Sequence, residues 1–171
     1  MLEEQVVLVD TEDQILGYMP KSEAHEKGLL HRAISILIYN SEGEMLIQQR
    51  ALSKYHWAGI WSNACCSHPR KGEKYIECAT RRLKEELNFD TQLSHAFTFI
   101  YKAFDEASGL TEHELDYVFI GKYNGDIDFN REEVQAVQWI SIEDLEEDLE
   151  NNPDKYSFWF KIILDKIRQQ G

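Results

Sequence analysis

Glu112 and Glu114 could bind a metal ion. A single residue separates the two glutamates, and on a β-strand this spacing aims both side chains at the same face. Two like carboxylates on one face repel each other unless a cation or a proton lies between them. The pair therefore indicates a metal site, and two solvent-exposed glutamates are the simpler alternative.

A second charged stretch could bind a diphosphate. Glu73, Arg81, Arg82, Glu85 and Glu86 lie in a loop and in a helix predicted over residues 74–88. Carboxylates in such a segment bind hard divalent cations, and these cations can hold a diphosphate. Glutamates and arginines with i, i+4 spacing also occur on solvated helix faces. The charge pattern alone leaves both interpretations open.

The three cysteines, Cys65, Cys66 and Cys78, are an odd number in a sequence without a secretion signal. This combination favours a reducing compartment, with free thiols or metal ligands. A structural zinc site formed by the cysteines and His68 is one interpretation, but adjacent cysteines do not provide the paired C-x2-C spacing of such sites. We expect Cys65 and Cys78 to pack in the core, as most unpaired cysteines do.

Residues 67–89 resemble the Nudix box, G-x5-E-x7-R-E-U-x-E-E-x-G-U, in which U is aliphatic. Five residues match it with the correct spacing: Glu73, Arg81, Leu83, Glu85 and Glu86. Three positions differ, because Ser67, Arg82 and Asn88 replace the first Gly, the Glu after the Arg, and the late Gly. In Nudix hydrolases the replaced Glu belongs to the cluster that binds water-activating metals. The resemblance therefore implies diphosphate binding and weakens the case for diphosphate hydrolysis.

From about His25 to Trp159 the chain is similar to the type I isopentenyl-diphosphate Δ-isomerases, which belong to the Nudix superfamily. The matching fragments occur in the family's order and spacing: His25, His31-Arg32-Ala33, Gln49-Arg50-Ala51-Leu52-Ser53-Lys54, Gly59-Ile60-Trp61-Ser62-Asn63, Cys66-Ser67-His68-Pro69, Tyr101 and Glu112-His113-Glu114. The resemblance implies that isopentenyl diphosphate is converted to dimethylallyl diphosphate. It also implies a small homoallylic or allylic diphosphate as the substrate, in isoprenoid precursor biosynthesis.

The family's reaction moves a double bond through a tertiary carbocation. One group protonates the alkene, a second removes a different proton from the far side, and water must be excluded because it would trap the cation. By resemblance, Cys66 and Glu114 are the two proton-transfer groups, and Tyr101 hydrogen-bonds Glu114. The residue types do not say which of the two donates the proton.

The resemblance also implies two divalent metal ions. The ligands of one ion, Mn²⁺, Zn²⁺ or Mg²⁺, match His25, His31, His68, Glu112 and Glu114. Imidazole ligands favour a transition metal at this site. Glu86 and the backbone carbonyl of Cys66 match the ligands of a Mg²⁺ ion that bridges the diphosphate.

The remaining substrate-binding positions of the family fall on basic and aromatic residues. The basic residues would bind the diphosphate, because Arg and Lys are its usual partners: Lys21, Arg50, Lys54 and Arg82. Trp61 and Trp159 would stabilise the carbocation, because an aromatic face attracts positive charge without reacting with it.

Two other functions stay open at this point. One is a Nudix diphosphate hydrolase with an altered box, and the other is a non-catalytic regulator that binds a metal and a diphosphate. Cys66 argues against a hydrolase, which has no need of that thiol, and Arg82 argues against it too. A regulator would bind the diphosphate without converting it.

These residues need a scaffold that brings distant segments together. Apolar runs predict strands over residues 5–9, 15–18, 33–39, 45–49, 97–103, 115–122 and 134–140. Helices are expected between Ser22 as N-cap and Gly28 as C-cap, over residues 74–88, from Ser141 onward and over residues 157–169. Residues 51–71 are expected to form a loop. Interleaved strands and helices with hairpins predict an α/β (α+β) class, here a Nudix-like mixed β-sheet sandwiched by helices.

Two of the predicted helices should each bury an apolar stripe. For residues 74–88 the stripe is Ile76, Ala79, Thr80, Leu83 and Leu87. For residues 157–169 it is Phe158, Trp159, Ile162, Ile163, Lys166 and Ile167.

Length and composition limit the class of protein. A chain of 171 residues corresponds to one domain, so we expect a single domain over residues 1–171. The apolar runs are too short for a membrane helix and the N-terminus lacks signal-peptide features, so we expect a cytoplasmic protein without a membrane partner. The sequence forces no oligomer, and we expect a monomer or a weak homodimer.

The charge distribution limits the partners. The formal net charge of −13 argues against nucleic acid, which needs a basic stripe. Residues 45–84 nevertheless contain 8 basic and 2 acidic residues, a local charge of +6, whereas residues 143–150 contain six acids. A small phosphate-bearing substrate therefore remains compatible with the acidic total.

Overall fold

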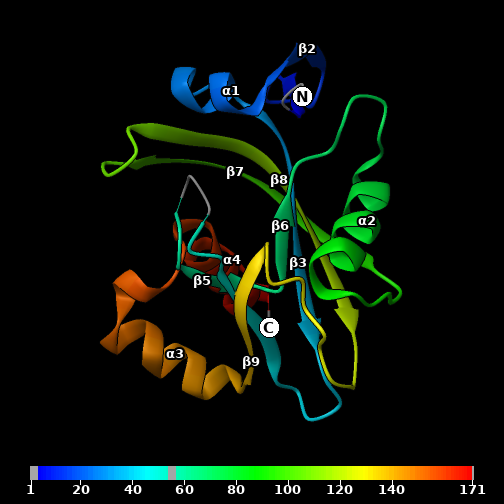
Figure 1. Ribbon diagram of the computed structural model, residues 1–171, viewed down its shortest axis with the longest axis vertical. Helices are drawn as coiled ribbons and strands as arrows, with labels where there is room; N and C mark the ends of the chain where they lie inside the picture. Colours follow the sequence, from blue (N-terminus) through cyan, green and yellow to red (C-terminus); the bar gives the residue numbers. More distant parts are fainter. Residues whose placement is uncertain (1–3, 54–56, 171) are drawn as a thin grey trace.

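The computed structural model describes residues 4–53 and 57–170 (Figure 1). Lys54 lies outside the described residues. Within them, nine strands form one mixed sheet: β1 Gln5–Val9, β2 Ile15–Pro20, β3 His31–Tyr39, β4 Met45–Arg50, β5 Trp61–Asn63, β6 Cys65–Ser67, β7 Ser94–Asp105, β8 Leu110–Lys122 and β9 Val134–Ile140. The helices are α1 Lys21–Lys27, α2 Tyr75–Leu87, α3 Ile142–Asn151, the 3-10 helix η1 Pro153–Lys155, and α4 Phe158–Gln170.

β3 is the central strand and has neighbours along both edges. One edge pairs in parallel with β8, residues 31–39 against residues 114–122. The other edge pairs antiparallel with β1 at its start, β6 in its middle and β4 at its end. β4 continues the sheet through β5 and β9. A strand buried on both faces carries a nearly continuous apolar run, which explains the sequence of β3.

The register of the sheet brings candidate site residues into two rows. Tyr101 on β7 pairs with Glu114 on β8, and Glu114 pairs with His31 on β3. Four residues further along β3, Ser35 pairs with Cys66 on β6. Side chains alternate between faces, so a slip of one residue would send the shifted strand's side chains to the opposite face. Strand pairing therefore determines which side chains meet in the site.

Helices cover both faces of the sheet (Figure 1). Leu83 of α2 packs in a cluster with Ile36 of β3, whereas Trp159 and Phe160 of α4 pack in a second cluster with Leu37. Consecutive strand residues face opposite sides, so the two clusters lie on opposite faces of the sheet. The predicted class, a mixed sheet sandwiched by helices, is confirmed. Within the described ranges, the helices are too short or too polar to cross a bilayer.

Several element boundaries differ from the prediction. The expected loop over residues 51–71 contains β5 and β6, whose three residues each are too few to show a period. β8 begins at Leu110 rather than at residue 115. α1 begins directly after Pro20, so Ser22 as N-cap is wrong, whereas Gly28 is the C-cap with φ of 66°.

The two predicted apolar stripes were partly wrong. In α2, Ile76 is 39% exposed, and the buried face consists of Cys78, Ala79, Leu83, Glu86 and Leu87. In α4, Phe158 is 47% exposed, and the buried residues are Trp159, Phe160, Ile163 and Leu164. Cys65 and Cys78 are core residues, as predicted.

Candidate active site

Three imidazoles from three separate elements meet beside the sheet. His25 comes from α1, His31 begins β3, and His68 directly follows β6. Their candidate ligand nitrogens lie within 4.8 Å of one another. His25 and His31 are fully buried. Such a cluster has the nitrogen donors of a transition-metal site, and neutral imidazole is the form that binds a metal.

The hydrogen bonds of two of these histidines aim their Nε2 atoms at Glu114. His31 donates from Nδ1–H to the carbonyl of Leu29 at 2.8 Å, which leaves its Nε2 facing Oε2 of Glu114 at 3.5 Å. Nε2 of His68 lies 2.6 Å from the same oxygen. Burial lowers the pKa of His68, against the effect of Glu114. A metal-ligating histidine usually makes the backbone contact seen at His31, so the residues present fit a bound metal ion.

Glu112, Glu114 and Tyr101 form a buried group of hydrogen bonds. The Tyr101 hydroxyl contacts Oε2 of Glu112 at 2.6 Å and also contacts Oε1 of Glu114. Burial and the neighbouring charge of Glu114 raise the pKa of Glu112 well above its usual range. Burial also raises the pKa of Glu114, but the charges and hydrogen bonds of His68 and His31 outweigh it, so that pKa is low. The surroundings therefore shift the pKa values of the two carboxyl groups in opposite directions, Glu112 upward and Glu114 downward.

Cys66 presents its sulfur to the same cavity and is surrounded by polar groups. Its Sγ lies 3.2 Å from Oδ1 of Asn63, 3.1 Å from Nε1 of Trp159 and 3.7 Å from Oγ of Ser35. Burial and the charge of Asp116 raise the pKa of Cys66 to about 12, against the effect of these hydrogen bonds. The sulfur therefore carries a proton at neutral pH.

The charged face of α2 closes the other end of the site. Nη2 of Arg82 lies 2.9 Å from Oε2 of Glu86 and 3.3 Å from Oε2 of Glu133. Gln48 donates from Nε2 to Oε1 of Glu86 at 3.0 Å and to the carbonyl of Ala64 at 2.6 Å. These contacts hold the Glu86 carboxylate in one orientation inside the site.

The other box carboxylates are used in ion pairs. Arg81 binds Glu73 at 2.7 Å and Glu85 at 2.8 Å, and Arg82 also binds Glu85 at 3.1 Å. Glu85 has 42% of its side chain exposed. Within the described part of the chain, Glu86 is therefore the matching box carboxylate that lines the cavity.

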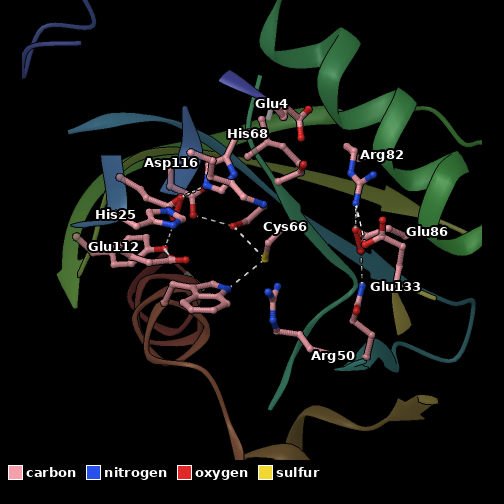
Figure 2. Close-up of a pocket in the computed structure, with 18 residues that line it drawn as sticks. Glu4, His25, Arg50, Cys66, His68, Arg82, Glu86, Glu112, Asp116 and Glu133 are labelled. Atoms are coloured by element: carbon pink, nitrogen blue, oxygen red, sulfur yellow. Dashed lines mark hydrogen bonds and ion pairs between the residues drawn. The ribbon is translucent and has the colours of Figure 1, made fainter. Parts of the chain in front are cut away.

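A cavity of about 140 Å³ connects the two ends of the site. Figure 2 shows the sulfur of Cys66 between His25 and Glu112 on one side and Arg82 and Glu86 on the other. Lys21, Arg50, Tyr101 and Trp159, four other residues of the predicted site, also line the cavity. Trp61 lines a neighbouring groove with Trp57, and Trp57 packs edge-on against Trp159 at 5.6 Å.

The sequence interpretation missed several residues that line the cavity: Glu4, Ser35, Gln48, Asp116 and Glu133. Asp116 follows Glu112 and Glu114 at the same two-residue interval, so the strand period could have identified it if the strand had been predicted from Leu110. Burial and the charge of Glu114 raise the pKa of Asp116 well above its usual range. Gln48 and Glu133 have no local motif, because only the pairing of β4 and β9 with the rest of the fold brings them here.

Comparisons with known proteins agree with the fold and with the family resemblance. The NUDIX domain family matches residues 29–160. Three similar proteins are named isopentenyl-diphosphate Delta-isomerase. The first, number 2 of Aromatoleum aromaticum, is 43% identical and aligns over 97% of this chain and 87% of its own. Those of Serratia proteamaculans and Aliivibrio fischeri MJ11 are 42% and 45% identical, over 97% and 96% of this chain and 92% and 94% of their own.

Solved structures share the fold at low sequence identity. DR0079 from Deinococcus radiodurans superimposes with a TM-score of 0.77 at 17% identity, over 97% of this chain and 98% of that one. The MutT protein from Methanosarcina mazei gives a TM-score of 0.67 at 19% identity, over 82% of this chain and 94% of that one.

Proposed function

The chain belongs to the isopentenyl-diphosphate Δ-isomerases with a Nudix domain, the type I enzymes, and from this premise we propose how its cavity performs their reaction. The protein converts isopentenyl diphosphate to dimethylallyl diphosphate. The observation that carries the proposed mechanism is the position of Cys66 and Glu114, which line one small cavity where the surroundings raise the pKa of Cys66 and lower the pKa of Glu114.

Cys66 and Glu114 are the proposed proton-transfer groups. The isomerisation adds one proton to the alkene and removes a different one, so it needs one group that carries a proton and one that can accept it. The raised pKa of the Cys66 thiol suits the group that carries the proton, and the lowered pKa of Glu114 suits the group that accepts one. Tyr101 contacts Glu114 through its hydroxyl and can carry a proton to or from that carboxylate.

The carbocation would form among aromatic groups in a restricted space. Tyr101 and Trp159 line the cavity with ring centroids 6.1 Å apart. Their faces attract positive charge without reacting with it. The cavity of about 140 Å³ leaves little room for bulk water.

The cluster of His25, His31 and His68, completed by Glu112 and Glu114, is the proposed site of one divalent ion, Mn²⁺, Zn²⁺ or Mg²⁺. A bound ion would supply positive charge beside Glu114 and so change its proton affinity. The protein residues would position this ion from α1, β3, β6 and β8.

The diphosphate would bind at the opposite end. We assign it to Arg82, which lies beside Glu86, with Arg50 and Lys21 as the other cationic residues of the cavity wall, and with Mg²⁺ held by Glu86 and the Cys66 carbonyl. Lys54 remains a predicted contact outside the described residues, and Trp61 a predicted one in the neighbouring groove. With the diphosphate bound in this way, the alkene of the substrate would lie near Cys66 and Glu114.

Hydrolysis fits the same residues poorly. A Nudix hydrolase gathers several box carboxylates around its metals, whereas here Arg81 and Arg82 pair with Glu73 and Glu85. A hydrolase also has no use for the Cys66 thiol, which lines the same cavity.

Product analysis tests the proposal. The purified protein is incubated with isopentenyl diphosphate, Mg²⁺ and Mn²⁺, and the products are separated by chromatography. We expect dimethylallyl diphosphate without release of orthophosphate or pyrophosphate. Phosphate release without isomerised product would support the hydrolase, and binding without turnover would support the regulator.

A further inference from the structure

We propose that Asn63 is a positioning residue, which fixes the direction of the Cys66 thiol in the cavity. The proposal rests on the role assigned to Cys66 above. Asn63 ends β5, is fully buried, and is separated from Cys66 by two residues. The family resemblance includes Asn63 only as the last residue of the fragment Gly59-Ile60-Trp61-Ser62-Asn63 and gives it no role.

The orientation of the Asn63 amide is set by its own contacts. Its Nδ2 donates two hydrogen bonds, to the carbonyls of Ile36 and Cys65, both at 3.0 Å. An amide nitrogen has two protons to donate, so both are used. Oδ1 is therefore the atom left to face Cys66, and it also accepts a hydrogen bond from Oγ of Ser62 at 2.8 Å. A flipped amide would place oxygen against two carbonyl oxygens.

The fixed Oδ1 acceptor of Asn63 determines which hydrogen bonds the Cys66 thiol can form. The carbonyl oxygen of Asn63 can only accept, and the indole Nε1 of Trp159 can only donate. The sulfur lies 3.2 Å from the first and 3.1 Å from the second. Its S–H must therefore point toward Asn63 while a lone pair accepts from Trp159. The two contacts together hold the sulfur in one position at the cavity wall.

Ser35 does not replace Asn63 in this role. The Ser35 hydroxyl donates to Oδ2 of Asp116 at 2.7 Å, and its oxygen lies 3.7 Å from the sulfur, farther than either of the other two partners. Removing the Asn63 acceptor would free the thiol to rotate about its Cα–Cβ bond. A smaller fraction of the enzyme would then hold the sulfur in the reactive position.

Steady-state kinetics of Asn63→Ala test the proposal. We expect kcat to fall on the order of 10- to 100-fold, as for other misplaced reactive groups. The KM for isopentenyl diphosphate should stay within about twofold, because the proposed diphosphate contacts are unchanged. A general structural defect would instead change kcat, KM and thermal stability together.

Ser62→Ala is the matched control. It removes the other hydrogen bond to Oδ1 of Asn63 and the contact with Ser157 at 2.8 Å, but leaves the bond to Cys66 intact. We expect kcat close to that of the parent enzyme. A folded Asn63→Ala enzyme with the parent kcat, or an equal loss of kcat in Ser62→Ala, would overturn the proposal.

If Asn63→Ala does not fold, infrared spectroscopy of the parent enzyme tests whether the Cys66 thiol donates the proposed hydrogen bond. The S–H stretching band of Cys66 is isolated by subtracting the spectrum of Cys66→Ala from that of the parent enzyme. We expect a band shifted to lower frequency by the hydrogen bond. A band at the position of a free thiol, or no band, would overturn the proposal. An active Cys66→Ala enzyme would instead refute the assigned role of Cys66, whatever the band position.

Discussion

Several side chains of the candidate site are held in one orientation by a hydrogen-bonding neighbour. Nδ1 of His31 binds a backbone carbonyl, Tyr101 binds Glu112 and Glu114, and Gln48 binds Glu86. A buried polar group without such a partner would be costly, so these contacts both stabilise the fold and fix the geometry. Substitution of the reactive groups and of their neighbours should therefore have different effects.

Cys66→Ala and Glu114→Gln should each remove nearly all isomerase activity. Each variant removes one of the two proton-transfer groups, and we expect kcat to fall by about 10³-fold or more. Product formation is measured by chromatography and folding by circular dichroism. Cys65→Ala is the matched control, because Cys65 is fully buried in the core cluster beneath α2. It should lose some stability but keep its kcat. Near-normal activity of either site variant would contradict the assignment.

Gln48→Leu should raise the Mg²⁺ concentration needed for half-maximal activity. The leucine cannot hold Glu86 in place, and loss of such an orienting contact typically weakens metal binding by about 10- to 100-fold. Activity is measured as a function of Mg²⁺ at a saturating Mn²⁺ concentration. Gln49→Leu is the control, because Gln49 faces the neighbouring groove and donates to the Gly59 carbonyl at 3.0 Å. An equal shift in both variants would argue against a specific role of Gln48.

At the scale of the elements, segments with a clear period could be predicted from the sequence. Very short strands, and the buried face of a helix that is apolar on most sides, could not. The pattern over residues 134–140 has the same bounds as β9. The three-residue strands β5 and β6 form only because β4 and β3 pair with them, which no local pattern contains. The stripe of α4 was misplaced because apolar residues surround the helix, and packing against the sheet selects Phe160 and Leu164 over Phe158.

The candidate site residues were predicted from the family resemblance, and the fold explains why spacing alone could not predict them. His25, His31 and His68 are far apart in sequence and meet only through the ends of α1, β3 and β6. Local patterns indicated only the charged stretch from Glu73 to Glu86 and the pair Glu112 and Glu114, whose two-residue interval correctly placed both on one strand face.

Gly28→Ala should weaken metal binding by the histidine cluster. Gly28 ends α1 with φ of 66° and lies between His25 and His31, so a strained residue there would shift both. We expect a stability loss of about 1 kcal/mol and a lower affinity for Mn²⁺, measured by calorimetry. Gly43→Ala is the control, since Gly43 has φ of 78° in the β3–β4 turn and open space around it. It should lose similar stability and keep its Mn²⁺ affinity; equal affinity losses would contradict the prediction.

For the whole molecule, the charge distribution differs from the one counted along the sequence. Ion pairs with carboxylates outside the stretch over residues 45–84 offset part of its positive charge: Arg70 pairs with Glu4, Arg81 with Glu85, and Arg82 with Glu133. The described residues that line the cavity include six carboxylates and three cationic side chains: Glu4, Glu86, Glu112, Glu114, Asp116 and Glu133, against Lys21, Arg50 and Arg82. An excess of carboxylates repels a diphosphate, so divalent cations should be required for substrate binding as well as for chemistry.

Metal binding should therefore stabilise the entire fold. The histidine cluster joins α1 to the sheet, so an ion bound only by the folded state adds about 2.7 kcal/mol at 100 times its dissociation constant. For a chain of this size that corresponds to a rise in Tm of roughly 5 to 10 °C. Calorimetric melting of the chelator-treated protein, with and without Mn²⁺, measures the shift. His25→Ala should lose it, whereas His95→Ala, which removes an imidazole bonded to Thr98, should keep it. An equal shift in His25→Ala would place the stabilising ion elsewhere.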